Sequence, residues 1–217
     1  MGQKDISLVR YFEDQERYAD LINGFIFDGD QVVTGQDILD MDSRATGVWG
    51  RIKGRFTVQK YRDCVRKVIF GMDFAIVGIE NQDRVHYGMP IRIMLEDAAG
   101  YDRQMRQIRR RHRSRSDLHG DEFLSGFARH DKVYPVVTIC IYYGKTPYDG
   151  PKELYQMMEY EHLPRQLMGL LNNYRIHVLE IRSLEKNRLF QDGFAGSVWL
   201  YPALRRCEKG TVIYQRT

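Results

Sequence analysis

Residues 69–89 constrain the fold most, because an apolar strand in this stretch ends in two polar side chains on the same face. Successive side chains of a strand point to opposite faces, so Glu80 and Gln82 are neighbours on one face of a strand predicted over 73–82. The preceding residues 59–69 alternate in the same way and predict a second strand, joined to the first by a tight turn. The pattern therefore predicts a hairpin with a polar end.

An acid on the first strand of this hairpin would complete a metal site. Asp63 is such an acid. Two carboxylates on adjacent strands can hold Mg²⁺, which prefers oxygen ligands and keeps several waters. One retained water would be the nucleophile in phosphodiester hydrolysis. The same residues also fit an ordinary strand that leaves the core and turns at 81–83, and that alternative stays open at this point.

Seven short motifs occur in an order that is typical of one known family. They are RYF at 10–12, ADLING at 19–24, MDSR at 41–44, QKYRD at 59–63, GIENQDRVHY at 78–87, EFLSGF at 122–127 and YYG at 142–144. With them the chain resembles the Rpn family of recombination-promoting nucleases, also labelled transposases, in the PD-(D/E)XK superfamily. The resemblance covers residues 5–191 and implies an α/β fold with a restriction-endonuclease-like core, a mixed central sheet flanked by helices.

The resemblance implies a catalytic set of Asp20, Asp63, Glu80 and Gln82, with Mg²⁺ held by Asp63 and Glu80. Gln82 stands where the commoner motif, Glu-x-Lys, has lysine, as it does in the Glu-x-Gln variant of the family. Glutamine can orient a water or a phosphate oxygen, but it lacks the charge of lysine, and charge-assisted hydrogen bonds are roughly twice as strong as neutral ones. Lys67 is either a displaced cation or an ordinary strand lysine.

A long helix is predicted to begin near Pro90, with an apolar face formed by residues spaced three and four apart. These residues are Ile91, Met94, Ala98, Tyr101, Met105, Ile108 and His112. Arginines gather on the other side of the same helix: Arg92, Arg103, Arg106, Arg110 and Arg113. Charged helix faces are commonly just solvated, but seven arginines within 103–115 exceed what solubility requires. Phosphate contact with a double-stranded DNA partner is therefore the second interpretation of this face, and both stay open.

The rest of the chain predicts further elements of one α/β domain. A helix is expected over 13–27, a buried central strand over 133–143, helical structure from 154 to 171 and a strand over 174–181. A short helix is expected near Phe123. The 33 Lys and Arg exceed the 29 Asp and Glu only slightly, so the distribution of charge matters more than its total.

Composition also limits the location and the partners. The three cysteines are far apart and predict neither a zinc site nor a disulfide framework, which favours a reducing cytoplasm. No apolar run reaches the roughly 18 residues of a membrane span, and the first residues lack a signal peptide, so no membrane association is expected. A homodimer stays open.

The resemblance stops near residue 191, and residues 192–217 lose any regular period. Shifting the reading frame of a back-translated tail by one base gives a helix-like continuation similar to the family's. We therefore expect an irregular tail produced by a frameshifted, truncated gene. Two functions follow. The first is a Mg²⁺-dependent DNA endonuclease linked to recombination or mobile elements. The second is a non-catalytic DNA-binding remnant of such a nuclease.

Overall fold

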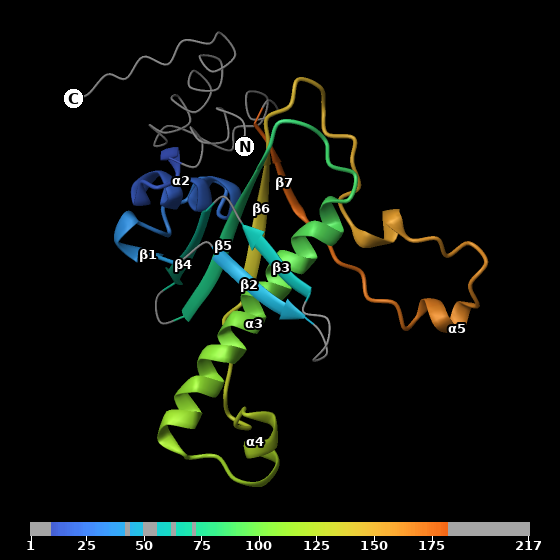
Figure 1. Ribbon diagram of the computed structural model, residues 1–217. Helices are drawn as coiled ribbons and strands as arrows, with labels where there is room; N and C mark the ends of the chain where they lie inside the picture. The colour runs from blue at the N-terminus through green and yellow to red at the C-terminus, as the bar shows by residue number, and fades with distance from the viewer. Residues whose placement is uncertain (1–9, 42–43, 50–55, 62–63, 71–72, 182–217) are drawn as a thin grey trace.

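A five-stranded mixed sheet lies at the centre of the computed structural model (Figure 1), which describes residues 10–41, 44–49, 56–61, 64–70 and 73–181. Its strands, in spatial order, are β1 (Ile38–Asp40), β4 (Cys64–Phe70), β5 (Asp73–Gln82), β6 (Val136–Tyr142) and β7 (His177–Glu180). Neighbours β1, β4 and β5 pair antiparallel, whereas β5, β6 and β7 pair parallel. The chain is thus an α/β protein with helices packed against a mixed sheet, as expected.

The antiparallel hairpin and the parallel pair arise from different connections. A tight connection joins β4 to β5, so these strands must run antiparallel. A parallel neighbour needs a long crossover, which is supplied by α3 (Met89–Arg115) before β6 begins. The strands predicted over 73–82, 133–143 and 174–181 are confirmed as β5, β6 and β7.

The single strand predicted over 59–69 is wrong in its first part. Residues up to Tyr61 belong to β3 (Phe56–Tyr61), which pairs with β2 (Arg44–Trp49) in a separate two-stranded sheet. Only β4, from Cys64 onward, pairs with β5. Both strands have the same period of two, so alternation alone does not reveal that the chain leaves one sheet for another.

One face of the sheet packs against α2 (Gln15–Ile26), as predicted over 13–27. Asp14 caps this helix by accepting a hydrogen bond from the Arg17 backbone at 3.1 Å. Tyr18 is fully buried and donates from its hydroxyl to the Val77 carbonyl of β5 at 2.8 Å. This contact fixes α2 across the centre of the sheet, where the largest apolar cluster lies.

The other face packs against α3, and here the predicted apolar face is partly wrong. Ile91 and Tyr101 are 41% and 38% exposed. The face that is actually buried mixes apolar and polar residues: Met89, Ile93, Glu96, Asp97, Gln104, Ile108 and His112. The reason is that Asp97, Gln104 and His112 have hydrogen-bond partners elsewhere in the fold, while Glu96 pairs with Arg92 on the same helix. A hydrophobic period cannot register such partners. The two-stranded β2–β3 sheet also packs against α3.

The remaining elements are short. They are η1 (Gly35–Asp37), α4 (Gly120–Ser125), η2 (Leu154–Met157) and α5 (Arg165–Met168). The helix expected near Phe123 is confirmed as α4, whereas the helical segment expected over 154–171 is reduced to η2 and α5. Among the described residues, no helix combines the length and apolar character needed to cross a membrane. The tail over 192–217 and its boundary lie outside the described residues.

Candidate functional site

The polar end of β5 lies on the face of the sheet that α3 covers. Gln82 donates from Nε2 to Oε1 of Glu80 at 2.9 Å, so the two side chains are neighbours on one face, as the alternation predicts. Glu80 is only 1% exposed, because α3 covers it. A carboxylate in such a place needs compensating partners, since burying an unpaired charge is very costly.

Arg92, from the first turns of α3, supplies the charge that compensates Glu80. Its terminal nitrogen forms an ion pair with Oε1 of Glu80, and its Nε lies 3.3 Å from Oε1 of Glu96, four residues further along the helix. Glu96 is also only 1% exposed, and the Arg92 side chain is 31% exposed. One guanidinium is therefore shared between two buried carboxylates. This position differs from the solvent-facing stripe in which the sequence pattern puts Arg92.

A third buried acid, Asp97, adjoins Glu96 on α3. It accepts a hydrogen bond from the Thr138 hydroxyl of β6 at 2.6 Å and another from the Tyr174 hydroxyl. The contacts form two sets, which we together call the acidic cluster. The first joins Glu80, Gln82, Arg92 and Glu96, and the second joins Asp97, Thr138 and Tyr174. It lies between α3 and the parallel part of the sheet.

Sequence reasoning missed Glu96, Asp97, Thr138 and Tyr174 as members of this cluster. Two signals were present. Arg92 and Glu96 have the spacing of an ion pair on a helix. Thr138 interrupts an otherwise apolar buried strand, and a buried hydroxyl normally has a partner. Neither signal identifies which distant residue that partner is.

Of the two other expected acids the structure describes Asp20, and no described contact joins it to Glu80. Asp20 lies on α2, which covers the opposite face of the sheet from α3. Burial raises the pKa of Asp20, and the nearby carboxylates of Glu16 and Asp14 raise it further. Asp63 lies outside the described residues. Lys67, on β4, lies with its ammonium 4.4 Å from the centre of the Tyr134 ring.

The described residues do not by themselves fit a Mg²⁺ ion. No group of three or more His, Cys, Asp or Glu side chains in the described part of the chain could hold a metal. Of the two expected ligands, Glu80 is described, and its Oε1 is held by Gln82 and Arg92. A guanidinium beside this oxygen competes with a cation for the same negative charge.

A pocket of about 620 Å³ opens where the polypeptide leaves β5 and β6. Its lining carries two cations, Arg84 and Lys145, and two acids, Asp83 and Asp149, together with Tyr87 and Tyr142. The Tyr87 hydroxyl donates to Asp149 at 3.3 Å. Ligands of open α/β sheets bind outside the carboxyl ends of parallel strands, and this pocket directly follows Gln82.

The arginine stripe of α3 lies in the second half of the helix. Arg110 and Arg113 are exposed, and Arg103 and Arg106 are partly exposed. Arg106 pairs with Asp102 at 3.0 Å.

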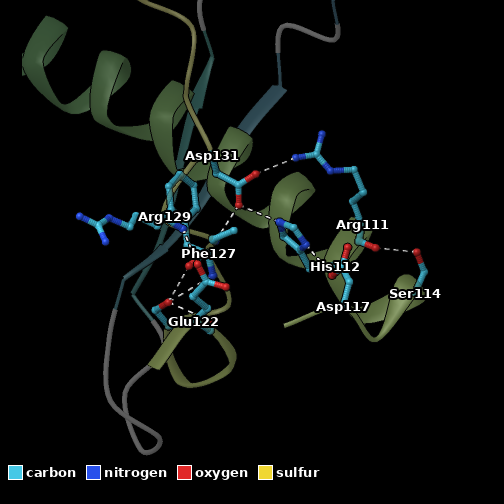
Figure 2. Close-up of polar contacts among 10 residues, drawn as sticks. Arg111, His112, Ser114, Asp117, Glu122, Phe127, Arg129 and Asp131 are labelled. Carbon is cyan, nitrogen blue, oxygen red and sulfur yellow. Dashed lines mark hydrogen bonds and ion pairs between the residues drawn. The ribbon is translucent and has the colours of Figure 1, made fainter. Parts of the chain in front are cut away.

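The end of α3 is held by a second polar cluster (Figure 2). His112 is buried, and its Nδ1 and Nε2 lie 2.6 Å from Asp117 and 2.7 Å from Asp131. A neutral imidazole has a single N–H, so contact with a carboxylate at both nitrogens requires the doubly protonated ring. The hydrogen bonds to Asp117 and then to Asp131 raise the pKa of His112 accordingly. We call this arrangement the His112 clamp.

Comparison of the chain with protein-family models, with curated proteins and with solved structures finds no match.

Proposed function

We propose that this chain is a DNA endonuclease of the PD-(D/E)XK kind, similar to the Rpn family. The observation that carries the proposal is the pair formed by Glu80 and Gln82. They share a face at the polar end of β5, joined by a hydrogen bond of 2.9 Å, on the second strand of an antiparallel hairpin. The resemblance to the family implies an acid and a third residue on a strand of this kind.

The residues around Glu80 favour a phosphodiester substrate. The Gln82 amide holds the Glu80 carboxylate in one orientation, and Arg92 brings a guanidinium beside it. Positive groups fixed in a partly buried site stabilise the negative charge that grows on phosphate oxygens during hydrolysis. In the adjacent pocket Arg84 and Lys145 would contact phosphate oxygens individually, since Asp83 and Asp149 balance the net charge of the lining. Mg²⁺ belongs to this proposal through Asp63, which lies outside the described residues.

The C-terminal half of α3 and the residues that follow it, as far as 132, support DNA as the substrate. Residues 103–132 carry nine Lys and Arg but four Asp and Glu, whereas the whole chain has an excess of only four positive charges. Each phosphate that such a surface neutralises contributes about −0.9 to the slope of log affinity against log salt concentration. Four phosphate contacts, made by Arg103, Arg106, Arg110 and Arg113, would therefore give a slope of about −3.6.

The second candidate is a non-catalytic DNA-binding protein. It is favoured by Arg92, which already neutralises Glu80, and by the lack of a metal-binding group in the described part of the chain. In that case the acidic cluster stabilises the fold, and DNA binding depends on α3 alone.

Nicking of supercoiled plasmid, with Mg²⁺ or with EDTA, separates the two functions. An endonuclease nicks only with Mg²⁺ and loses this activity in Glu80→Gln, while the exposed control Glu161→Gln keeps it. Gln82→Lys, which restores the commoner motif, should keep or increase the rate. DNA binding without nicking would select the second candidate, and equal nicking by Glu80→Gln and the wild type would exclude catalysis at this site.

A further inference from the structure

Residues 103–132 form an ordered projection, which we call the basic arm. It comprises the C-terminal half of α3, the helix α4 and the loop that leads to β6. In Figure 1 this part of the chain continues beyond the sheet. Figure 2 shows how it is held: His112 joins Asp117 to Asp131, and Arg111 pairs with Asp131 at 3.1 Å.

Further bonds fix α4 within the arm. Arg109 donates from Nε to the Ser125 carbonyl at 3.2 Å, and the Arg129 backbone donates to Glu122 at 2.8 Å. Gly126 ends α4 with a positive φ of 68°, directly against the Arg109 side chain. The arm is thus built by specific contacts between residues far apart in sequence, and α4 has a defined place on it.

Two large apolar side chains are exposed on this fixed helix. Phe123 is 70% exposed and Leu124 is 83% exposed. Single exposed apolar residues are common. Phe123 and Leu124, however, are neighbours on a fixed helix, and their apolar surface leaves water only when a partner covers it.

The charge around these residues identifies that partner as a polyanion. Of the four acids of the arm, Asp117 and Asp131 bind His112, Glu122 accepts from the Arg129 backbone, and Asp121 is exposed. The arm also carries more exposed basic side chains than this one exposed acid can balance: Arg110, Arg113, Arg115, Arg129 and Lys132. A second copy of the chain would bring the same positive charge and be repelled. Residues 103–115 also spread their arginines along about 20 Å of helix, which suits a linear phosphate backbone better than the plane of a membrane.

We propose that the basic arm docks on duplex DNA and that Phe123 and Leu124 insert at a base step. Apolar side chains that enter between base pairs unstack and bend the duplex, while neighbouring cations hold the phosphates. Arg110 and Arg113 supply phosphate contacts that do not read sequence. This inference rests on the proposed function, because it takes DNA from it as the partner.

The test measures binding to a random duplex over a series of salt concentrations, in EDTA so that no cleavage interferes. Phe123→Ala/Leu124→Ala should weaken binding at least about fivefold, the lower end for one base stacked on a side chain, without changing the salt slope. Arg110→Glu/Arg113→Glu should instead flatten the slope by about 1.8. Leu170, 75% exposed but outside the arm, gives the control Leu170→Ala, which should bind like the wild type.

A second measurement reports insertion directly. Plasmid relaxed by a metal-independent topoisomerase with the wild type bound should change its linking number, because inserted side chains unwind the duplex. The change should vanish in Phe123→Ala/Leu124→Ala at saturating protein. The melting temperature of that variant should equal that of the wild type, since both side chains are exposed.

Three outcomes would overturn the inference. Equal affinity and an equal linking-number change in the apolar variant would leave the arm a purely electrostatic surface. Loss of self-association, or of binding to anionic vesicles, with DNA binding intact would assign Phe123 and Leu124 to another partner. A wild type that binds no duplex would remove both this inference and DNA as the proposed substrate. Plasmid nicking by Glu80→Gln, by contrast, tests only the proposed catalytic site.

Discussion

Replacing Arg92 by glutamine should destabilise the protein far more than the same change at Arg106. Arg92 is the guanidinium that Glu80 and Glu96 share, and both carboxylates are only 1% exposed. Removing it leaves two buried negative charges without this shared partner. Arg106 lies on the same helix, but its pair with Asp102 has both side chains 34% exposed.

The structure sets the size of the two effects. Breaking a buried ion pair by removing one partner costs about 3–5 kcal/mol. Because the Arg92 side chain is 31% exposed, water screens the pair and the lower end, about 3 kcal/mol, applies. For a chain of this size the loss lowers the melting temperature by roughly 6–12 °C. The exposed pair of Arg106 contributes about 0.3–0.5 kcal/mol, or roughly 1–2 °C.

Thermal and urea unfolding of both variants at neutral pH test this expectation. A double-mutant cycle between Arg92→Gln and Glu80→Gln should give a coupling energy of about 1–3 kcal/mol, since the two side chains are in contact. Arg92→Lys keeps the charge but loses the planar guanidinium that reaches both acids. The stability of this variant should therefore lie between that of the wild type and that of Arg92→Gln. If Arg92→Gln melts within about 2 °C of the wild type, well below the roughly 6–12 °C expected for it, Arg92 is not the main counter-charge of the cluster.

Two further predictions concern other buried polar groups. His112 has a raised pKa because of Asp117 and Asp131, so its contribution to stability is complete below its unfolded value of about 6.5 and is lost as pH rises through the folded value. The gap in melting temperature between the wild type and His112→Gln should therefore be largest near pH 5.5–6 and close at alkaline pH, and a gap that grows with pH would contradict the clamp. Asn23, 1% exposed, donates to the Val33 carbonyl at 2.7 Å and accepts from its N–H at 2.9 Å. Asn23→Ala leaves the Val33 carbonyl and N–H without this partner and should lower the free energy of unfolding in urea by about 3 kcal/mol. A loss below about 1 kcal/mol would mean that water replaces the side chain.

The polar end of β5 could be predicted from the sequence because it depends on local geometry. Strict alternation over 73–82 needs only the period of a strand, and it correctly gives Glu80 and Gln82 one face. The β4–β5 hairpin follows from the same local pattern, because a tight turn leaves the chain one neighbour to pair with. The order of parallel strands beyond it depends on α3 and on longer connections.

The surroundings of Glu80 could not be predicted, because they depend on contacts across the chain. Asp97 is buried since Thr138 and Tyr174 reach it from β6 and from the residues before β7. A hydrophobic period treats an acid as a surface residue. It therefore predicts that the buried face of α3 contains Ile91 and Tyr101 instead of Asp97. The position of Arg92 in the predicted DNA-binding stripe has the same cause. Helix geometry gives the direction of a side chain but not the charge of the groups that it contacts.

Because α3 is one continuous helix, it also sets the spacing between the acidic cluster and the basic arm. From Arg92 to His112 the helix advances 20 residues, which is about 30 Å at 1.5 Å per residue. Duplex DNA rises 3.4 Å per nucleotide along each strand, so this length corresponds to about nine base pairs. If both proposals hold, one duplex lying along α3 spans about nine base pairs between the Glu80 site and the His112 clamp that holds the basic arm, a distance fixed by the helix. If the bound protein protects fewer than about nine base pairs of a duplex, the arm and the Glu80 site contact different duplexes. The two proposals would then describe separate activities of the same helix.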